Sequence, residues 1–124
     1  MLFMKSCFQI VFGIILLSLC TFLHAESPIT KRIDQFANNK VRVWKTIIYP
    51  SSKQVLPMHR HEHDRVLVAL TDGVLKITND KGAVHHLKLK KDQAYYLTKD
   101  MPGELHNDEN VSQHTIKVIV VELN

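Results

Sequence analysis

The chain has 124 residues, a formal net charge of +4 and 45% hydrophobic residues, which fits one modest domain rather than two. Its 16 basic and 12 acidic residues are interspersed, so it lacks the basic stripe with interleaved aromatic residues that nucleic-acid-binding proteins carry. Neither a Gly-x-Ser-x-Gly sequence nor a phosphate-binding glycine loop is present. Composition and motifs therefore argue against nucleic-acid binding, serine hydrolysis and nucleotide binding.

The N-terminal segment, residues 1–25, predicts a secretory signal peptide. One lysine near the start is followed by an almost unbroken apolar run over residues 8–19, and Ala25 precedes a polar stretch. The run is shorter than the ~18–20 residues of a membrane span. We therefore expect cleavage after Ala25, no stable membrane insertion afterwards, and a periplasmic or secreted protein. An uncleaved anchor is one alternative, and lipidation at Cys20 is another, although Leu19 replaces the small residue usual before a lipidated cysteine.

Both cysteines of the chain, Cys7 and Cys20, lie in this segment. A mature chain that begins at Glu26 would therefore have no disulfide, no cysteine nucleophile and no cysteine metal ligand. We expect residues 26–40 to form a lead-in segment, either extended or as one helical turn, before a domain over residues 41–124. Pairing of two copies through residues 29–33, giving a homodimer, is a further expectation.

From residue 41 onward the chain is predicted to be all β. Residues 41–49 and 115–123 are rich in β-branched side chains, and turn signals separate shorter strands between them. Residues 71–73 (Thr-Asp-Gly) predict a tight turn within a hairpin, and residues 79–82 (Asn-Asp-Lys-Gly) predict a second turn. Short strands with turn signals every eight to twelve residues or so are typical of a β-sandwich or barrel.

Three of the eight histidines, His59, His61 and His63, alternate just before a strand-like segment. In an extended chain, side chains two residues apart lie on one face at roughly 6.6–7 Å. The three imidazoles are therefore expected to form a row, with the intervening charged residues on the other face. Two such imidazoles can bind one divalent ion if a third ligand comes from elsewhere in the chain.

The spacing of several residues resembles the two sequence motifs of the cupin family, whose members are small β-barrels of the jelly-roll type. His59, His61 and Gly73 match the first motif, and Gly103, His106 and Asn110 match the end of the second. The resemblance covers about residues 41–123. It implies an all-β fold, a small jelly-roll (cupin-like) β-barrel, and it implies that His59, His61 and His106 are ligands of a divalent metal ion.

The chain departs from the family pattern at the fourth ligand. In the first motif six residues separate a glutamate from the glycine that corresponds to Gly73. Val66 occupies that position, and Arg65 occupies the other permitted one. Neither is a carboxylate, and the positive charge of Arg65 would repel a cation. The resemblance therefore carries over three ligands and leaves the fourth unassigned.

Two further residues are candidate ligands. His63 could replace His59 or act as a fourth ligand, although the spacing to Gly73 favours the pair formed by His59 and His61. Glu104 precedes His106 by two residues in a long polar loop and could serve as a substitute ligand or a general base. The alternative for both is a solvated side chain at the mouth of the barrel.

The expected cofactor is a divalent metal ion, and zinc, iron, manganese, nickel and copper all accept imidazole ligands. By resemblance, the chain is a metal-dependent enzyme of the oxygenase, isomerase or lyase type that acts on a small organic molecule. A non-catalytic module that binds a metabolite or the metal is the alternative, and a degenerate site without metal is the third interpretation. No side chain is assigned a catalytic role, because fold does not select chemistry.

Overall fold

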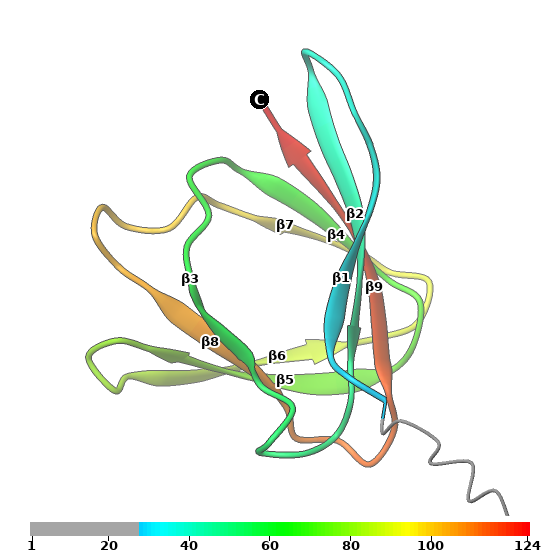
Figure 1. Cartoon of the computed structure of the whole chain (residues 1–124), viewed down its shortest axis with the longest axis vertical. Coiled ribbons are helices and arrows are strands. Elements are labelled where there is room, and N and C mark those ends of the chain that lie inside the picture. Colours follow the sequence, from blue (N-terminus) through cyan, green and yellow to red (C-terminus); the bar gives the residue numbers. More distant parts are fainter. Residues whose placement is uncertain (1–27) are drawn as a thin grey trace, which may run out of the picture.

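A computed structural model of the protein describes residues 28–124, so the predicted signal peptide and its cleavage site lie outside the described residues. The described chain forms nine strands in two antiparallel sheets and contains no helix, which confirms the all-β prediction (Figure 1). The strands are β1 (Lys31–Ala37), β2 (Val41–Ile48), β3 (Leu56–His59), β4 (Arg65–Ala69), β5 (Gly73–Asn79), β6 (Val84–Leu89), β7 (Ala94–Leu97), β8 (His106–Asn110) and β9 (Ile116–Leu123).

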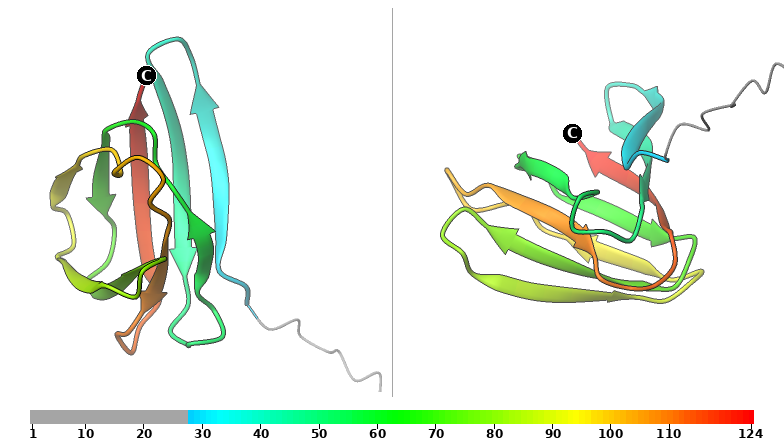
Figure 2. Two further views of the ribbon diagram at one scale, coloured as in Figure 1. Left: turned by 90° about the vertical axis from the view of Figure 1, so that its left-hand side faces the viewer. Right: turned by 60° about the horizontal axis from the view of Figure 1, so that its bottom comes forward.

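The two sheets have the strand orders β1-β2-β9-β4-β7 and β3-β8-β5-β6. Strands β2 and β9, from opposite ends of the described chain, pair along their whole length, from Val41 opposite Leu123 to Ile48 opposite Ile116. Both sheets curve around a common interior, with β5 and β6 crossing below the five-stranded sheet (Figures 1 and 2). Many sequential neighbours are therefore in different sheets, and most pairing is long-range.

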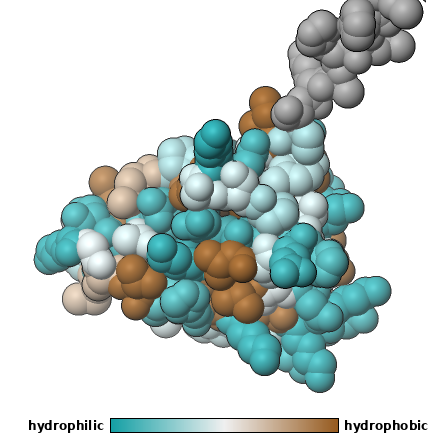
Figure 3. All heavy atoms as spheres, turned by 90° about the horizontal axis from the view of Figure 1, so that it is seen from below, coloured by the Kyte–Doolittle hydropathy of each residue, from teal (hydrophilic) through white to brown (hydrophobic). Residues whose placement is uncertain are grey.

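The interior is built by alternation along the strands, since successive side chains of a strand point to opposite faces. The inward positions of β2, β4 and β9 are apolar over most of their length, and each large side chain buried there stabilises the fold by ~1.5–3 kcal/mol. The buried core consists of Trp44, Ile48, Leu67, Ala69, Leu75, Leu89, Ile116, Val118 and Val120. Seen from below, the outer surface is mostly hydrophilic with separate hydrophobic patches (Figure 3).

The predicted hairpin around residues 71–73 is wrong. Strand β4 belongs to the five-stranded sheet and β5 to the four-stranded sheet, so this turn carries the chain from one sheet to the other. Gly73 lies against Ile116 there, and a Cβ on Gly73 would come within 2.6 Å of Ile116 Cδ1, so only glycine allows the approach. The second predicted turn, residues 79–82, does join an antiparallel pair, β5 and β6.

Part of the predicted lead-in forms the edge strand β1, which pairs with β2 and so extends the five-stranded sheet. Of the two predicted forms, extended and helical, the structure has the extended one. The guanidinium of Arg32 lies 3.6 Å from the ring centroid of Trp44, a cation–π contact that ties β1 to the core. Ile33 and Phe36 of β1 are exposed.

No helix long and apolar enough to cross a membrane occurs in the part of the chain that the structure describes.

Candidate metal centre

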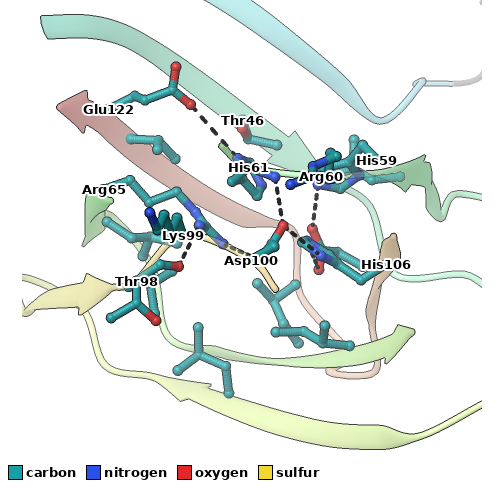
Figure 4. Close-up of a pocket in the computed structure, with 18 of the residues that line it drawn as sticks. Thr46, His59, Arg60, His61, Arg65, Thr98, Lys99, Asp100, His106 and Glu122 are labelled. Atoms are coloured by element: carbon teal, nitrogen blue, oxygen red, sulfur yellow. Dashed lines mark hydrogen bonds and ion pairs between the residues drawn. The ribbon is translucent and has the colours of Figure 1, made fainter. Parts of the chain in front are cut away.

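Three imidazoles, two from one stretch of the chain and one from a distant strand, meet at one end of the interior (Figure 4). His59 ends β3 and lies opposite His106, the first residue of β8. His61 follows in the loop between β3 and β4, so the extended row predicted for this stretch ends at His59. The ring centroids of His59 lie 4.5 Å from His106 and 4.9 Å from His61.

The spacing of the three imidazoles fits one shared ion. One nitrogen from each of His59, His61 and His106 lies within 4.8 Å of the others. With zinc–nitrogen bonds of about 2.0–2.1 Å, two nitrogens on one tetrahedral ion lie about 3.3–3.4 Å apart. Side-chain rotations that bring the nitrogens up to about 1.4 Å closer to one another therefore place the set around one ion.

His59 and His106 are each held at Nδ1. The Nδ1 of His59 donates a hydrogen bond to the carbonyl oxygen of Pro57 at 2.7 Å, because a carbonyl can only accept. The Nδ1 of His106 lies 3.3 Å from Oδ2 of Asp100. Partners of this kind fix the ring and the tautomer of a metal-binding histidine and leave Nε2 for the metal.

His61 is held by the walls of the cavity. Its ring is parallel to the indole of Trp44, with 6.4 Å between the centroids, and its Nδ1 lies 4.0 Å from Oε2 of Glu122. Burial, together with the smaller effect of the positive charge of Arg65, lowers the pKa of His61 to about 3. Burial also lowers the pKa of His106, against the opposing effect of Asp108. Both rings are therefore neutral near pH 7, which is the form that binds metal.

Asp100 connects the elements that carry the triad. Its Oδ2 accepts a hydrogen bond from the backbone N–H of His61 at 2.6 Å, and its own N–H donates to the carbonyl of His61 at 2.9 Å. The same Oδ2 faces His106, while Oδ1 lies 3.9 Å from the guanidinium of Arg65 (Figure 4). Sequence reasoning missed Asp100, because it lies 39 residues from His61 and occupies none of the matched motif positions.

The buried guanidinium of Arg65 occupies a position where the resemblance implies a carboxylate. It donates to the carbonyl of Thr98 at 3.2 Å and pairs with Asp100, so its charge is opposed within the protein. Within residues 28–124, three carboxylates lie within 4.0 Å of the imidazoles, those of Asp100, Asp108 and Glu122. When ionised, they place negative charge next to the triad, which suits a dication.

The other two candidate ligands lie outside the triad. His63 is exposed and Glu104 half-buried, and both line the cavity without joining the cluster of possible ligands. Besides Asp100, the fold brings the carboxylates of Glu122 and Asp108 close to the imidazoles. Alternation along β8 is a signal for Asp108, since it lies two residues after His106 and faces the same side. The position of Glu122 near the triad results from the pairing of β9 with β4, in which Glu122 lies opposite Arg65. No local sequence pattern predicts this pairing.

The triad opens into a cavity of about 1110 Å³ between the two sheets. This exceeds the ~300–1,000 Å³ typical of small-molecule pockets. Its walls combine apolar side chains, such as Leu67, Leu75 and Val120, with charged groups, among them Arg60 and Lys99. The arrangement can hold an ion and a small organic molecule side by side.

Comparisons with known proteins show one partial sequence relative. No protein-family model matches the chain. The chain is 38% identical over 65 residues to the protein named Beta-alanine degradation protein BauB of Pseudomonas aeruginosa. The match covers 52% of this chain and 64% of that protein, so it spans less than two thirds of the relative's length.

Solved structures resemble the chain over a larger part of its length. A cupin domain from Bordetella pertussis has a TM-score of 0.67 at 24% identity and covers 80% of this chain and 97% of that chain. A protein with a double-stranded β-helix domain from Klebsiella pneumoniae has a TM-score of 0.58 at 19% identity and covers 78% of each. An RmlC-like cupin from Methanocaldococcus jannaschii has a TM-score of 0.58 at 12% identity, covering 80% of this chain and 84% of that chain.

Proposed function

The chain has the cupin fold, and we propose that it binds one divalent metal ion through His59, His61 and His106. The observation that carries the proposal is the convergence of three imidazoles within 4.8 Å, two of them neutral through burial. The three carboxylates within 4.0 Å of these imidazoles support a dication at this position. Imidazole nitrogens suit zinc, iron, manganese, nickel and copper, so the donor set leaves the choice among these to measurement.

We further propose that the cavity holds a small organic molecule beside the ion, which would make the chain a metal-dependent enzyme of the oxygenase, isomerase or lyase type. A bound ion supplies Lewis acidity toward an oxygen of the ligand. The protein's own part is orientation and exclusion of water: Asp100 and Glu122 hold imidazoles, and the apolar wall that includes Leu67 and Leu75 shields the ligand.

A non-catalytic binding module is the second candidate. It is favoured by one observation, the absence of a carboxylate at Arg65 and Val66, where the family pattern has its glutamate. Tight binding of ligand or metal without product distinguishes this candidate from the enzyme.

The decisive experiment is a turnover assay on protein loaded in turn with each of the five metals. The name of the partial relative makes β-alanine and other short carboxylic acids a sensible start for the substrate panel. The enzyme proposal predicts product with at least one metal, its loss in His106→Ala, and its retention in His86→Ala, a matched control on the exposed face of β6. Ligand binding without product from any metal form would favour the binding module.

We also propose, from the N-terminal sequence, that the chain is exported and cleaved after Ala25. Cell fractionation and N-terminal sequencing of the exported protein test this. The expected first residue is Glu26, whereas a lipid-modified Cys20 or an uncleaved N-terminus would contradict it.

A further inference from the structure

We infer that Asp108 is a fourth ligand of the metal ion and takes the place of the carboxylate that Arg65 and Val66 do not provide. This inference rests on the proposed metal site. It moves the acidic ligand from β4 to β8, the strand that already contributes His106.

Strand β8 directs Asp108 toward the triad. His106 and Asp108 are two residues apart, so both side chains point to the interior, and only 14% of the Asp108 side chain is exposed. Asp108 also lies opposite Leu56 in the pairing with β3, the strand that ends at His59. Its carboxylate is thus enclosed between the two strands that present imidazoles.

The contacts of Asp108 differ in kind from those of the other carboxylates. Its Oδ2 lies 3.5 Å from Nε2 of His59, and its Oδ1 lies 3.9 Å from Nε2 of His106. Asp100 and Glu122 instead face Nδ1 atoms. Among the carboxylates within 4.0 Å of the triad in residues 28–124, Asp108 therefore faces the nitrogens that are free to bind metal.

These separations match two donors on one ion. Adjacent donors bound at about 2.0–2.2 Å lie roughly 2.8–3.6 Å apart in octahedral or tetrahedral sites. The 3.5 Å separation from His59 falls in this interval and the 3.9 Å separation from His106 is slightly longer, so side-chain rotations bring nitrogen and oxygen onto a common ion.

The position of the Asp108 charge points the same way. Its side chain is mostly enclosed beside the triad, and a cation held by the imidazoles would neutralise a carboxylate in that position.

Metal affinity tests the assignment directly. Zinc is titrated into the full chain and into Asp108→Asn against a chromophoric chelator, with circular dichroism as the check on folding. Removing a partner outside the coordination shell typically costs 10–100-fold in affinity, so a ligand should cost more than about 100-fold. Glu109→Gln is the matched control, because its side chain lies on the opposite face of β8 beside Lys76. Parent-like affinity in Asp108→Asn would overturn the inference.

A spectroscopic variant separates ligation from mere proximity. Asp108→Cys places a thiolate at the site, and cobalt bound to it should show a thiolate-to-metal absorption band in the near ultraviolet. Glu109→Cys carries the same number of cysteines, including Cys7 and Cys20, and serves as the reference. Identical spectra in the two cobalt-loaded variants would overturn the assignment of Asp108 as a ligand but would leave the proposed metal site standing. Failure of the parent chain to bind any ion would instead refute the proposed metal site.

Discussion

Replacing Asn110 with aspartate tests what fixes β8, the strand that presents His106. Asn110 is 3% exposed, and its Nδ2 donates to the carbonyls of Ile48 at 2.9 Å and His114 at 2.7 Å. Its Oδ1 accepts from the N–H of Ser112 at 2.9 Å. One amide thus joins the end of β8 to the end of β2 and to the loop before β9.

The size of the effect follows from the two donors that aspartate lacks. A buried acceptor left without its donor costs about 1–3 kcal/mol. Ile48 is fully buried and His114 is exposed, so the first carbonyl has no water to replace the amide and the second does. The new carboxylate also carries a negative charge that two carbonyl oxygens repel. Together with the lost hydrogen bonds, this should lower the free energy of unfolding by about 3 kcal/mol.

Urea unfolding of the metal-free protein measures this loss, with thermal unfolding as a second readout. For a domain of this size, about 3 kcal/mol corresponds to a fall in Tm of roughly 12–24 °C. Asn107→Asp makes the same chemical change on the outer face of β8 and should cost less than about 0.5 kcal/mol. Equal stabilities of the two variants would refute the reasoning.

Three further predictions concern other parts of the molecule. Gly73→Ala should lower the free energy of unfolding, measured in urea, by about 1–3 kcal/mol, because the added Cβ overlaps the buried side chain of Ile116. Wild-type stability of this variant would show that the contact between Gly73 and Ile116 is loosely packed. In chelator, the pKa of His61 is about 3 in the folded chain against 6.5 when free, so its contribution to stability is complete above pH 6.5 and is lost as pH falls toward 3. Between pH 6.5 and 5 the free energy of unfolding should fall by about 2 kcal/mol through this group. In urea unfolding, His61→Gln should show a correspondingly smaller fall over the same pH range. Parallel pH profiles of the two proteins would contradict the prediction. If two copies pair through residues 29–33, light scattering should show a dimer that Ile33→Asp converts to a monomer, whereas a monomeric parent chain would rule this pairing out.

The sequence was sufficient for the fold class and for the triad, because both depend on short-range signals. Strand periodicity needs only local alternation, and the spacings from His59 and His61 to Gly73 and from Gly103 to His106 match the family motifs that the chain resembles. The pairing of strands could not be predicted in the same way. The turn before Gly73 has the composition of a hairpin turn, but whether its flanking strands pair is decided by their contacts with β8 and β9, which no local signal contains.

The surroundings of the triad were predictable only in part, for the same reason. Asp108 shares a strand with His106 and follows from alternation along β8. Asp100 and Glu122 reach the imidazoles through loop geometry and through the pairing of β4 with β9, and these arise from the whole fold. Arg65 was predicted to repel a cation, but the sequence does not show that Asp100 pairs with it.

The metal content of the chain, produced with its own N-terminal segment and purified without added metal or chelator, tests the central claim most directly. Elemental analysis should find about one divalent ion per chain in the parent protein. The variant in which His59, His61 and His106 are all replaced by alanine should contain almost none while keeping its β-sheet circular dichroism. Equal metal content in the two proteins would contradict the assignment of the triad as the metal site.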